Sequence, residues 1–223
     1  YVISDETLAK AQVAKAEYEE SGDLFLFALC QLMLGWCYLL RGELDGAERE
    51  VQATLTLAER TGDVQNRIYA LTWLTFVRRM RGQVDAARDY AARTLEAATT
   101  AWMPEQIAAA QANQAWVAWR DGNQAEAEDL GQSALRLWQR SQWAYAFQWT
   151  ALWPLLVVAL EKEQVPEALH HARALLDPQQ QRMPADLESA LEKSCQMADA
   201  GQPEAVRAQL QRTVELAQEM GYL

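Results

Sequence analysis

Aromatic and arginine side chains that recur at a fixed spacing are the residues of this chain best suited to bind a ligand or a partner. Trp36, Phe76 and Trp116 follow one another at a constant interval, and Arg79 and Arg120 lie near them in sequence. Tryptophan and arginine are enriched among the residues that dominate protein interfaces, and aromatic rings also stack on sugars and on apolar peptide side chains. Two interpretations stay open, because these aromatic residues either line a groove or pack in a core.

The residue types that catalyse reactions or hold metals are sparse. The only two histidines, His170 and His171, are adjacent in sequence, so on a helix they point about 100° apart and do not chelate one metal well. We expect both on the solvated surface. Cys30, Cys37 and Cys195 form no CxxC pattern and are expected to be small reduced hydrophobic residues. No nucleotide-binding, zinc-protease or serine-hydrolase motif occurs. We therefore expect no catalysis, no cofactor and no metal.

The charge of the chain restricts its partners. The net charge is −11 and the pI is about 4.7, so a nucleic acid backbone or an acidic membrane surface would be repelled. The segment 24–40 has a single polar side chain, Gln31, but Asp23 and Arg41 bound it tightly, and it is in register with later segments that do not resemble membrane spans. We expect a cytoplasmic protein with no direct contact to nucleic acid or membrane.

A short sequence pattern repeats along the chain. Arg41-Gly42-Glu43-Leu44-Asp45-Gly46-Ala47 returns at 81–87 and again at 121–127, and a weaker copy follows at 162–168. The interval is about 40 residues, and a fixed period in the range of about 20–50 residues is typical of stacked-repeat architectures. The glycine of the pattern is expected in the left-handed conformation, and the alanine that ends the pattern is expected where two helices cross closely.

The apolar periodicity predicts an all-α chain of about eleven helices. Ser4 or Asp5 is expected to cap the first helix, Asp23 the second, and Pro154 is expected to kink the eighth. The segment 177–184 is expected to be a connector. The predicted helices span about 4–20, 23–40, 44–60, 64–81, 84–100, 104–120, 124–140, 142–162, 166–176, 185–199 and 203–220. Five repeats are expected, at about 23–62, 63–102, 103–141, 142–182 and 183–223, after a helix at 3–21 that belongs to a preceding repeat.

The pattern resembles the tetratricopeptide repeat. Leu34-Gly35, Tyr38 and Ala47 stand at the spacing of that family's motif, and the later copies keep Ala87, Ala127 and Ala168 among others. The usual period of that family is about 34 residues, so the helices here are longer. The longer, degenerate form resembles the MalT-like repeat region of large bacterial signalling and transcription regulators. The resemblance implies a single domain, 1–223, that is a right-handed superhelix of antiparallel helix pairs.

The resemblance also implies a binding groove, lined by the first helix of each pair. Its positions carry over to Trp36, Phe76, Arg79, Trp116, Trp119, Arg120 and Trp153, which we take as candidate partner-binding residues. In the first repeat every groove position is apolar, so upstream repeats, a second copy in a homodimer, or a partner should cover it. Seven of the nine tryptophans lie between Trp102 and Trp153, which indicates a dense local core rather than a cage for a ligand.

These observations predict a non-catalytic module for protein–protein interaction and scaffolding. A protein or peptide would bind in the concave groove. The chain begins with Tyr1 rather than Met, and we expect it to be the regulatory part of a longer signalling or transcription regulator. The alternative is an effector sensor whose groove holds an oligosaccharide or a peptide. A sensor needs a closed pocket with convergent polar groups, whereas a protein-binding face can be open and apolar.

Overall fold

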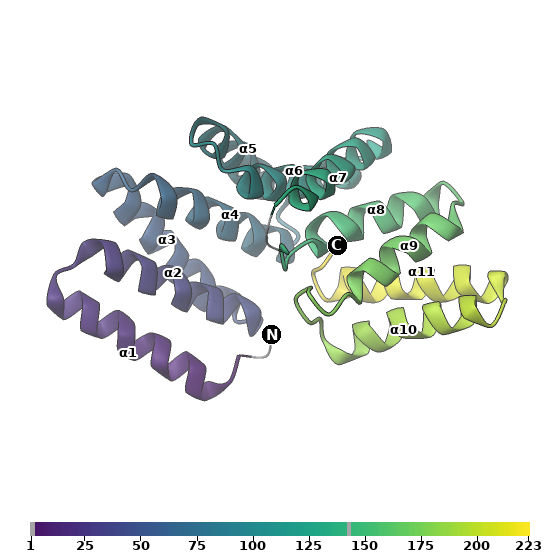
Figure 1. Ribbon diagram of the computed structural model, residues 1–223, viewed down its shortest axis with the longest axis horizontal. Coiled ribbons are helices and arrows are strands. Elements are labelled where there is room, and N and C mark those ends of the chain that lie inside the picture. The colour runs from purple at the N-terminus through teal and green to yellow at the C-terminus, as the bar shows by residue number, and fades with distance from the viewer. Residues whose placement is uncertain (1–2, 142–143) are drawn as a thin grey trace.

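The computed structural model describes residues 3–141 and 144–223, and over these residues the chain forms eleven helices and no strand. The helices are α1 (Asp5–Ser21), α2 (Leu24–Leu40), α3 (Leu44–Thr61), α4 (Val64–Met80), α5 (Val84–Thr100), α6 (Pro104–Arg120), α7 (Gln124–Gln139), α8 (Trp149–Glu161), α9 (Val165–Leu175), α10 (Ala185–Asp199) and α11 (Pro203–Glu219). Consecutive helices pack side by side as antiparallel pairs, so the expected all-α solenoid is confirmed (Figure 1).

The helix ends follow the expected capping chemistry. The Ser4 hydroxyl accepts a hydrogen bond from the Thr7 backbone N–H, and the Asp23 carboxylate accepts from two N–H groups at the start of α2. Side chains of this kind satisfy donors that have no partner within the helix. The repeat glycines Gly42, Gly82 and Gly122 have φ values of 75°, 66° and 81°, which confirms the left-handed turns.

Small residues let the two helices of each pair approach closely. Ala47, Ala87, Ala127 and Ala168 are all 0 % exposed. At Gly35, in the middle of α2, an added Cβ would lie 2.5 Å from the Val51 side chain of α3. The motif residues therefore act through packing, as the sequence predicts.

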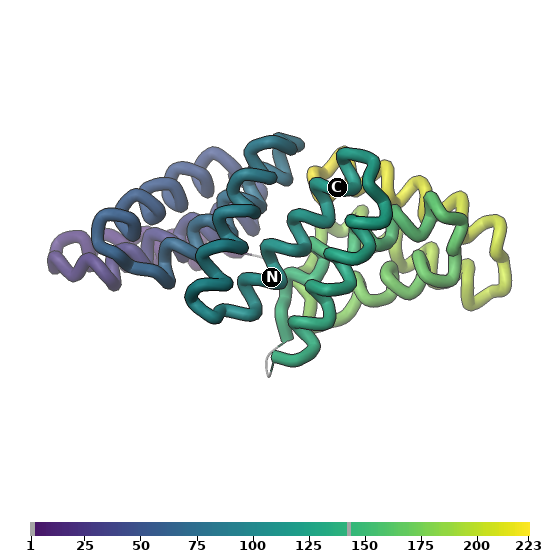
Figure 2. The backbone as a smooth tube through the Cα atoms, turned by 90° about the horizontal axis from the view of Figure 1, so that it is seen from above, coloured from purple at the N-terminus to yellow at the C-terminus, as the bar shows by residue number. Residues whose placement is uncertain are grey.

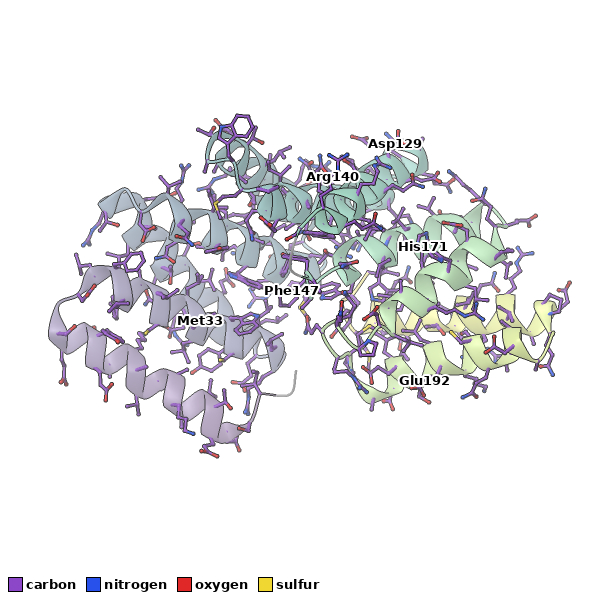
Figure 3. The ribbon with its side chains drawn as sticks, viewed as in Figure 1. Met33, Asp129, Arg140, Phe147, His171 and Glu192 are labelled. Carbon is purple, nitrogen blue, oxygen red and sulfur yellow. The ribbon has the colours of Figure 1, made fainter. Side chains whose placement is uncertain are left out.

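The solenoid curves around a filled centre. Helices α1–α5 form one side and α8–α11 the other, with α6 and α7 at the bend, and the two sides are clear in the perpendicular view (Figures 1 and 2). Phe147, labelled in Figure 3, lies between them. Its ring centroid is 5.2 Å from that of Trp73 and 6.0 Å from that of Phe76, both on α4. The segment before α8 thus supplies side chains to the concave interior.

The eighth helix differs from the prediction. It begins at Trp149 rather than at Gln142, which itself lies outside the described residues together with Trp143. Residues 144–148 are not helical because their polar backbone groups bond to the distant connector 177–184. Gln181 N–H donates to the Ala146 carbonyl at 2.8 Å, and the Gln148 N–H donates to the Gln180 side chain at 3.0 Å.

Within the described residues, the structure contains no helix that combines the length and apolar character needed to cross a membrane.

Candidate functional site

The candidate binding residues divide by exposure. Phe76, Trp116 and Trp153 are 0 % exposed, so the core interpretation holds for these three rings. Trp36 and Trp119 are half-buried, and Arg120 is exposed. The predicted ladder is not a direct stack, because Trp36 reaches Phe76 through Trp73 and Phe147, at centroid distances of 5.3–6.4 Å for the ring pairs. The concave face is therefore a packed aromatic cluster rather than an open groove.

Arg79 lies in the centre of this cluster with its guanidinium fully buried. Its carbon centre stands 5.5 Å from the Trp116 ring and 5.2 Å from the Trp149 ring. No carboxylate among the described residues forms an ion pair with it. Burial therefore lowers the pKa of Arg79 well below its ordinary value, because desolvation penalises the charged form. Two aromatic faces and backbone carbonyls take the place of a counter-ion.

The two nearer acceptors of Arg79 come from distant parts of the chain, and the Asn113 side-chain oxygen on α6 is a third at 3.5 Å. One guanidinium nitrogen donates to the Thr150 carbonyl at 2.7 Å, and the other donates to the Tyr222 carbonyl at 3.0 Å. The Thr150 carbonyl is available because Pro154, one helical turn later in α8, has no N–H to donate to it. The proline expected to kink α8 thus exposes an acceptor that the buried arginine uses.

The segment after α11 closes over the same cluster. Gly221 packs so tightly that an added Cβ would lie 2.5 Å from the Met80 carbonyl oxygen at the end of α4. The Tyr222 ring meets the Trp149 ring edge to face at 5.0 Å, and Leu223 is buried. Residues 221–223 therefore occupy concave surface that the sequence assigned to a partner.

An accessible cavity remains where the two sides of the solenoid approach. It has a volume of about 270 Å³. Its walls are mainly apolar and aromatic, and they come from the ends of α2 and α4, the segment before α8, the connector and the chain after α11. The lining residues are Leu39, Leu40, Arg41, Gly42, Phe76, Met80, Phe147, Trp149, Gln181, Pro184, Met220 and Tyr222. A more open hollow of about 400 Å³ adjoins it, because both are lined by Leu40, Arg41, Gln181, Pro184 and Tyr222. We call the two together the cleft.

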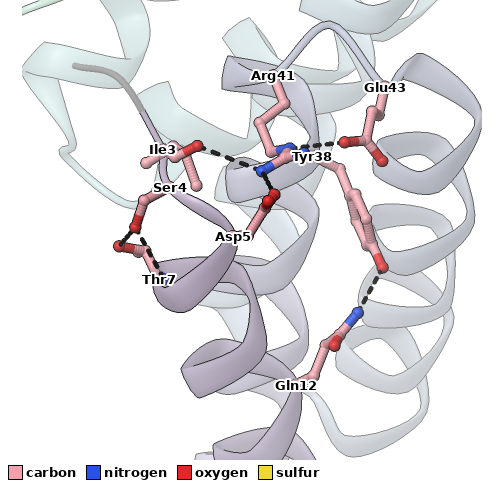
Figure 4. Close-up of polar contacts among 8 residues, drawn as sticks. All are labelled: Ile3, Ser4, Asp5, Thr7, Gln12, Tyr38, Arg41 and Glu43. Atoms are coloured by element: carbon pink, nitrogen blue, oxygen red, sulfur yellow. Dashed lines mark hydrogen bonds and ion pairs between the residues drawn. The ribbon is translucent and has the colours of Figure 1, made fainter.

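Two polar side chains of the cleft, Arg41 and Gln181, already have partners. Arg41 donates to the Asp5 carboxylate at 2.7 Å and to Glu43 at 2.6 Å (Figure 4). These hydrogen bonds, that to Asp5 first, raise the pKa of Arg41. The Gln181 side-chain oxygen accepts from the Trp149 indole N–H at 2.9 Å. The cleft therefore offers mainly apolar walls, and at its rim the charge of Arg41 is balanced by the Asp5 and Glu43 carboxylates.

Trp119 and Arg120 do not line the cleft. The Trp119 indole N–H donates to the Glu161 carboxylate at 3.1 Å, and the Arg120 guanidinium lies 5.3 Å from the Trp116 ring. The first-repeat position Leu32 is buried by neighbouring helices of the same chain, without a second copy. The structure thus brings the predicted aromatic residues into one cluster, but places this pair at a separate surface.

The prediction for the histidines is half wrong. His170 is exposed, but His171 is buried because it shares one face of α9 with Ala168, Ala172 and Leu175 at helical spacing. Its Nε2 lies 3.4 Å from the Glu167 carboxylate, yet burial lowers the pKa of His171 to about 4. The described residues contain no group of three or more His, Cys, Asp or Glu side chains able to hold a metal.

Sequence reasoning missed the cleft residues Phe147, Trp149, Gln181 and Tyr222. They lie outside the helix positions that the family resemblance had singled out. The dense tryptophans around Trp149 and the glutamines of the connector were visible signals, but they were interpreted as local core and as linker.

No family model matches this chain, and no curated protein matches it. Among solved structures, the crystal structure of BtubC (BKLC) from P. vanneervenii is similar, with 20 % sequence identity and a TM-score of 0.61. The similarity covers 96 % of this chain and 92 % of that one. At this identity the likeness shows the fold alone: both are helical-repeat proteins of similar extent.

Proposed function

We propose that the chain is a non-catalytic module for protein–protein interaction, and that its cleft receives an apolar side chain of a protein or peptide partner. The observation that carries the proposal is the accessible cavity of about 270 Å³ between the two sides of the solenoid. Apolar pockets with a few polar groups at the edge are typical binding sites, and aromatic anchors in such pockets dominate interface energies.

The chemistry of the cleft supports a peptide over a highly polar ligand. The side-chain oxygen of Gln181 already accepts from Trp149, and the backbone N–H of Gln181 donates to the Ala146 carbonyl, so the mainly apolar wall would offer a sugar few partners. Arg41 at the rim is already paired with the Asp5 and Glu43 carboxylates, so the apolar side chain of the partner would supply most of the contact. Binding there would contact both sides of the solenoid at once.

The biological setting is part of the same proposal. The repeat, with its period of about 40 residues, resembles the repeat regions of large bacterial regulators, so the module would serve as the regulatory or scaffolding part of such a protein. A partner that joins the two sides of the solenoid would change its curvature, and the change would be passed to neighbouring domains.

The second candidate is an effector sensor. A partly enclosed cavity at a junction between two halves of a molecule is also suited to a small ligand. Because its walls are mainly apolar and aromatic, the cavity favours a small apolar or aromatic effector, or a short peptide, over an oligosaccharide.

Peptides selected from a random displayed library against the wild-type protein test the proposal. Leu40→Glu places a charge on the cleft wall, and Leu130→Glu changes a half-buried leucine of α7 outside it as the matched control. We expect selected peptides to bind the Leu40→Glu variant at least about tenfold more weakly and the control unchanged. Peptides that bind both variants like the wild type, or a selection that enriches none, would refute the cleft as the peptide site.

A further inference from the structure

Arg79 has one guanidinium edge that is only half used. Its Nη1 donates to the Thr150 carbonyl at 2.7 Å, with the Asn113 side-chain oxygen 3.5 Å away, and its Nη2 donates to the Tyr222 carbonyl at 3.0 Å. Its Nε is buried and has no hydrogen-bond partner among the described residues. Buried donors without an acceptor are rare in folded proteins, so this one needs a physical explanation.

Nε and Nη2 together form the edge of a guanidinium that binds carboxylates. Their N–H bonds are parallel, so the two oxygens of one carboxylate accept both, and such charge-assisted bonds are about twice as strong as neutral ones. At Arg79 this edge donates to a single neutral oxygen, the Tyr222 carbonyl. A carboxylate in place of that carbonyl would satisfy Nε as well and would add a counter-ion.

The charges around Arg79 do not oppose an anion. Desolvation, with no contribution from a neighbouring charge, lowers the pKa of Arg79. Glu43 is the one carboxylate that lines the described part of the cleft, and it is paired with Arg41 at 2.6 Å. The other acidic groups of this chain act at a distance, and salt screens surface charges beyond about 8 Å at physiological ionic strength. An anion that reaches the guanidinium is therefore attracted to it.

Arg79 does not line the cavity, but two residues in contact with it do. Trp149, whose ring is 5.2 Å from the guanidinium carbon, and Tyr222 both belong to the cavity wall. The Tyr222 ring meets the Trp149 ring edge to face at 5.0 Å. Displacement of Tyr222 would therefore join the cavity of about 270 Å³ to the Nε–Nη2 edge and leave room for an aromatic ring beside Trp149.

Residues 221–223 are held against α4 by one hydrogen bond and by packing. The N–H groups of Gly221, Tyr222 and Leu223 all donate to carbonyls of α11, the helix that precedes them. Among the described residues, the bond from Arg79 is the only hydrogen bond that joins this segment to another helix. A ligand that takes both the ring position of Tyr222 and the bond from Arg79 therefore competes with three residues for one site.

We propose that this site binds a small aromatic carboxylate, whose ring packs on Trp149 and whose carboxylate accepts from Nε and Nη2 of Arg79 in place of residues 221–223. The proposal deepens the second candidate function, the effector sensor, and rests on it, whereas peptide binding at the cleft is not required. The end of the chain lies between the two sides of the solenoid in Figure 1, so binding would release a contact that joins them.

The probe is straight-chain para-hydroxyphenylpropionate, which reproduces tyrosine from the phenol ring to the carbonyl carbon and carries a carboxylate there. Its primary amide has the same shape without the charge and is the matched control ligand. Arg79→Lys keeps a cation but lacks the parallel N–H pair. Arg120→Met, the matched protein control, removes an exposed arginine that also lies over the Trp116 ring. Calorimetry measures binding, and hydrogen exchange measures the protection of the Tyr222 and Leu223 amides.

We expect the carboxylate to bind the wild type about tenfold or more tightly than the amide does, and to speed exchange of the two backbone amides. Arg79→Lys should lose this preference for the carboxylate, and Arg120→Met should keep it. Gly221→Ala leaves Arg79 intact and forces residues 221–223 away from Met80, so it should bind the carboxylate several-fold more tightly than the wild type.

The outcomes separate this site from the broader function. Equal binding of the carboxylate and the amide overturns the site at Arg79 but leaves the sensor of apolar effectors standing. Binding of neither ligand overturns the site and counts against the sensor as well. The inference is also overturned if Arg79→Lys keeps the preference for the carboxylate, if binding leaves the exchange of the Tyr222 and Leu223 amides unchanged, or if Gly221→Ala weakens binding.

Discussion

Replacing Arg79 with methionine, alone and together with Pro154→Ala, tests whether the proline supplies an acceptor for the buried arginine. Arg79→Met keeps an unbranched side chain but leaves the Thr150 and Tyr222 carbonyls without their donor. Each buried carbonyl left unsatisfied costs about 1–3 kcal/mol, so the two together cost about 2–6 kcal/mol. Relief of the desolvation of a buried charge opposes this loss by several kcal/mol.

Because these contributions oppose each other, the informative quantity is the coupling between the two sites. In the Pro154→Ala background the new N–H at position 154 can donate to the Thr150 carbonyl, one turn earlier in α8. Of these two carbonyls, Arg79→Met then leaves only that of Tyr222 without a donor. We expect the substitution to destabilise this background by about 1–3 kcal/mol less than it destabilises the wild type.

Denaturant unfolding of the four proteins in the cycle measures this coupling. The control cycle pairs Arg79→Met with Pro166→Ala, since Pro166 lies in the first turn of α9, where no helical N–H is required. That cycle should be additive. A coupling with Pro154→Ala within about 0.5 kcal/mol of zero would mean that the proline and the arginine act independently, and the reasoning would be wrong.

Three further predictions concern single positions. Gly35→Ala should lower the free energy of unfolding by about 1–3 kcal/mol, because its Cβ would stand 2.5 Å from Val51; an unchanged denaturation curve would contradict this. The pKa of His171 is about 4 in the folded protein against 6.5 when exposed. Its contribution to the free energy of unfolding is therefore fully present above pH 6.5, and it falls by up to about 3 kcal/mol as the pH drops towards 4. His171→Gln should remove that dependence on pH, and a slope that persists in the variant would belong to other groups. Gly221→Ala should displace residues 221–223 from Met80, which tryptophan quenching by acrylamide would report as increased accessibility; quenching equal to the wild type would show that the segment stays in place.

The local features of the fold were predictable because they depend on short-range rules. The range 84–100 was expected as a helix from apolar spacing and turn glycines alone, and α5 has these bounds. The start of α8 was not predictable in the same way. Residues 144–148 have helix-forming neighbours, but their backbone groups bond to the connector 177–184, which is far along the chain.

The candidate site was predictable in residue type but not in exposure. Local pattern identifies Phe76 and Arg79 as members of one helix face, yet it cannot reveal that residues 221–223 fold back onto that face. A buried arginine is unexpected from its own sequence context, because its acceptors, Thr150 and Tyr222, lie in distant parts of the chain. Trp102 was counted in the predicted dense core, yet its side chain is 89 % exposed and its φ is 55°.

The contact between Arg79 and Tyr222 has a consequence for how the chain unfolds. In an open repeat array each unit touches only its neighbours, so the ends fray and the units melt in succession. Here a hydrogen bond spans 143 positions and fastens the fourth helix to the last residues. The final helix pair, α10 and α11, cannot detach without exposing the buried centre of the preceding helices. We therefore expect the whole array to unfold cooperatively.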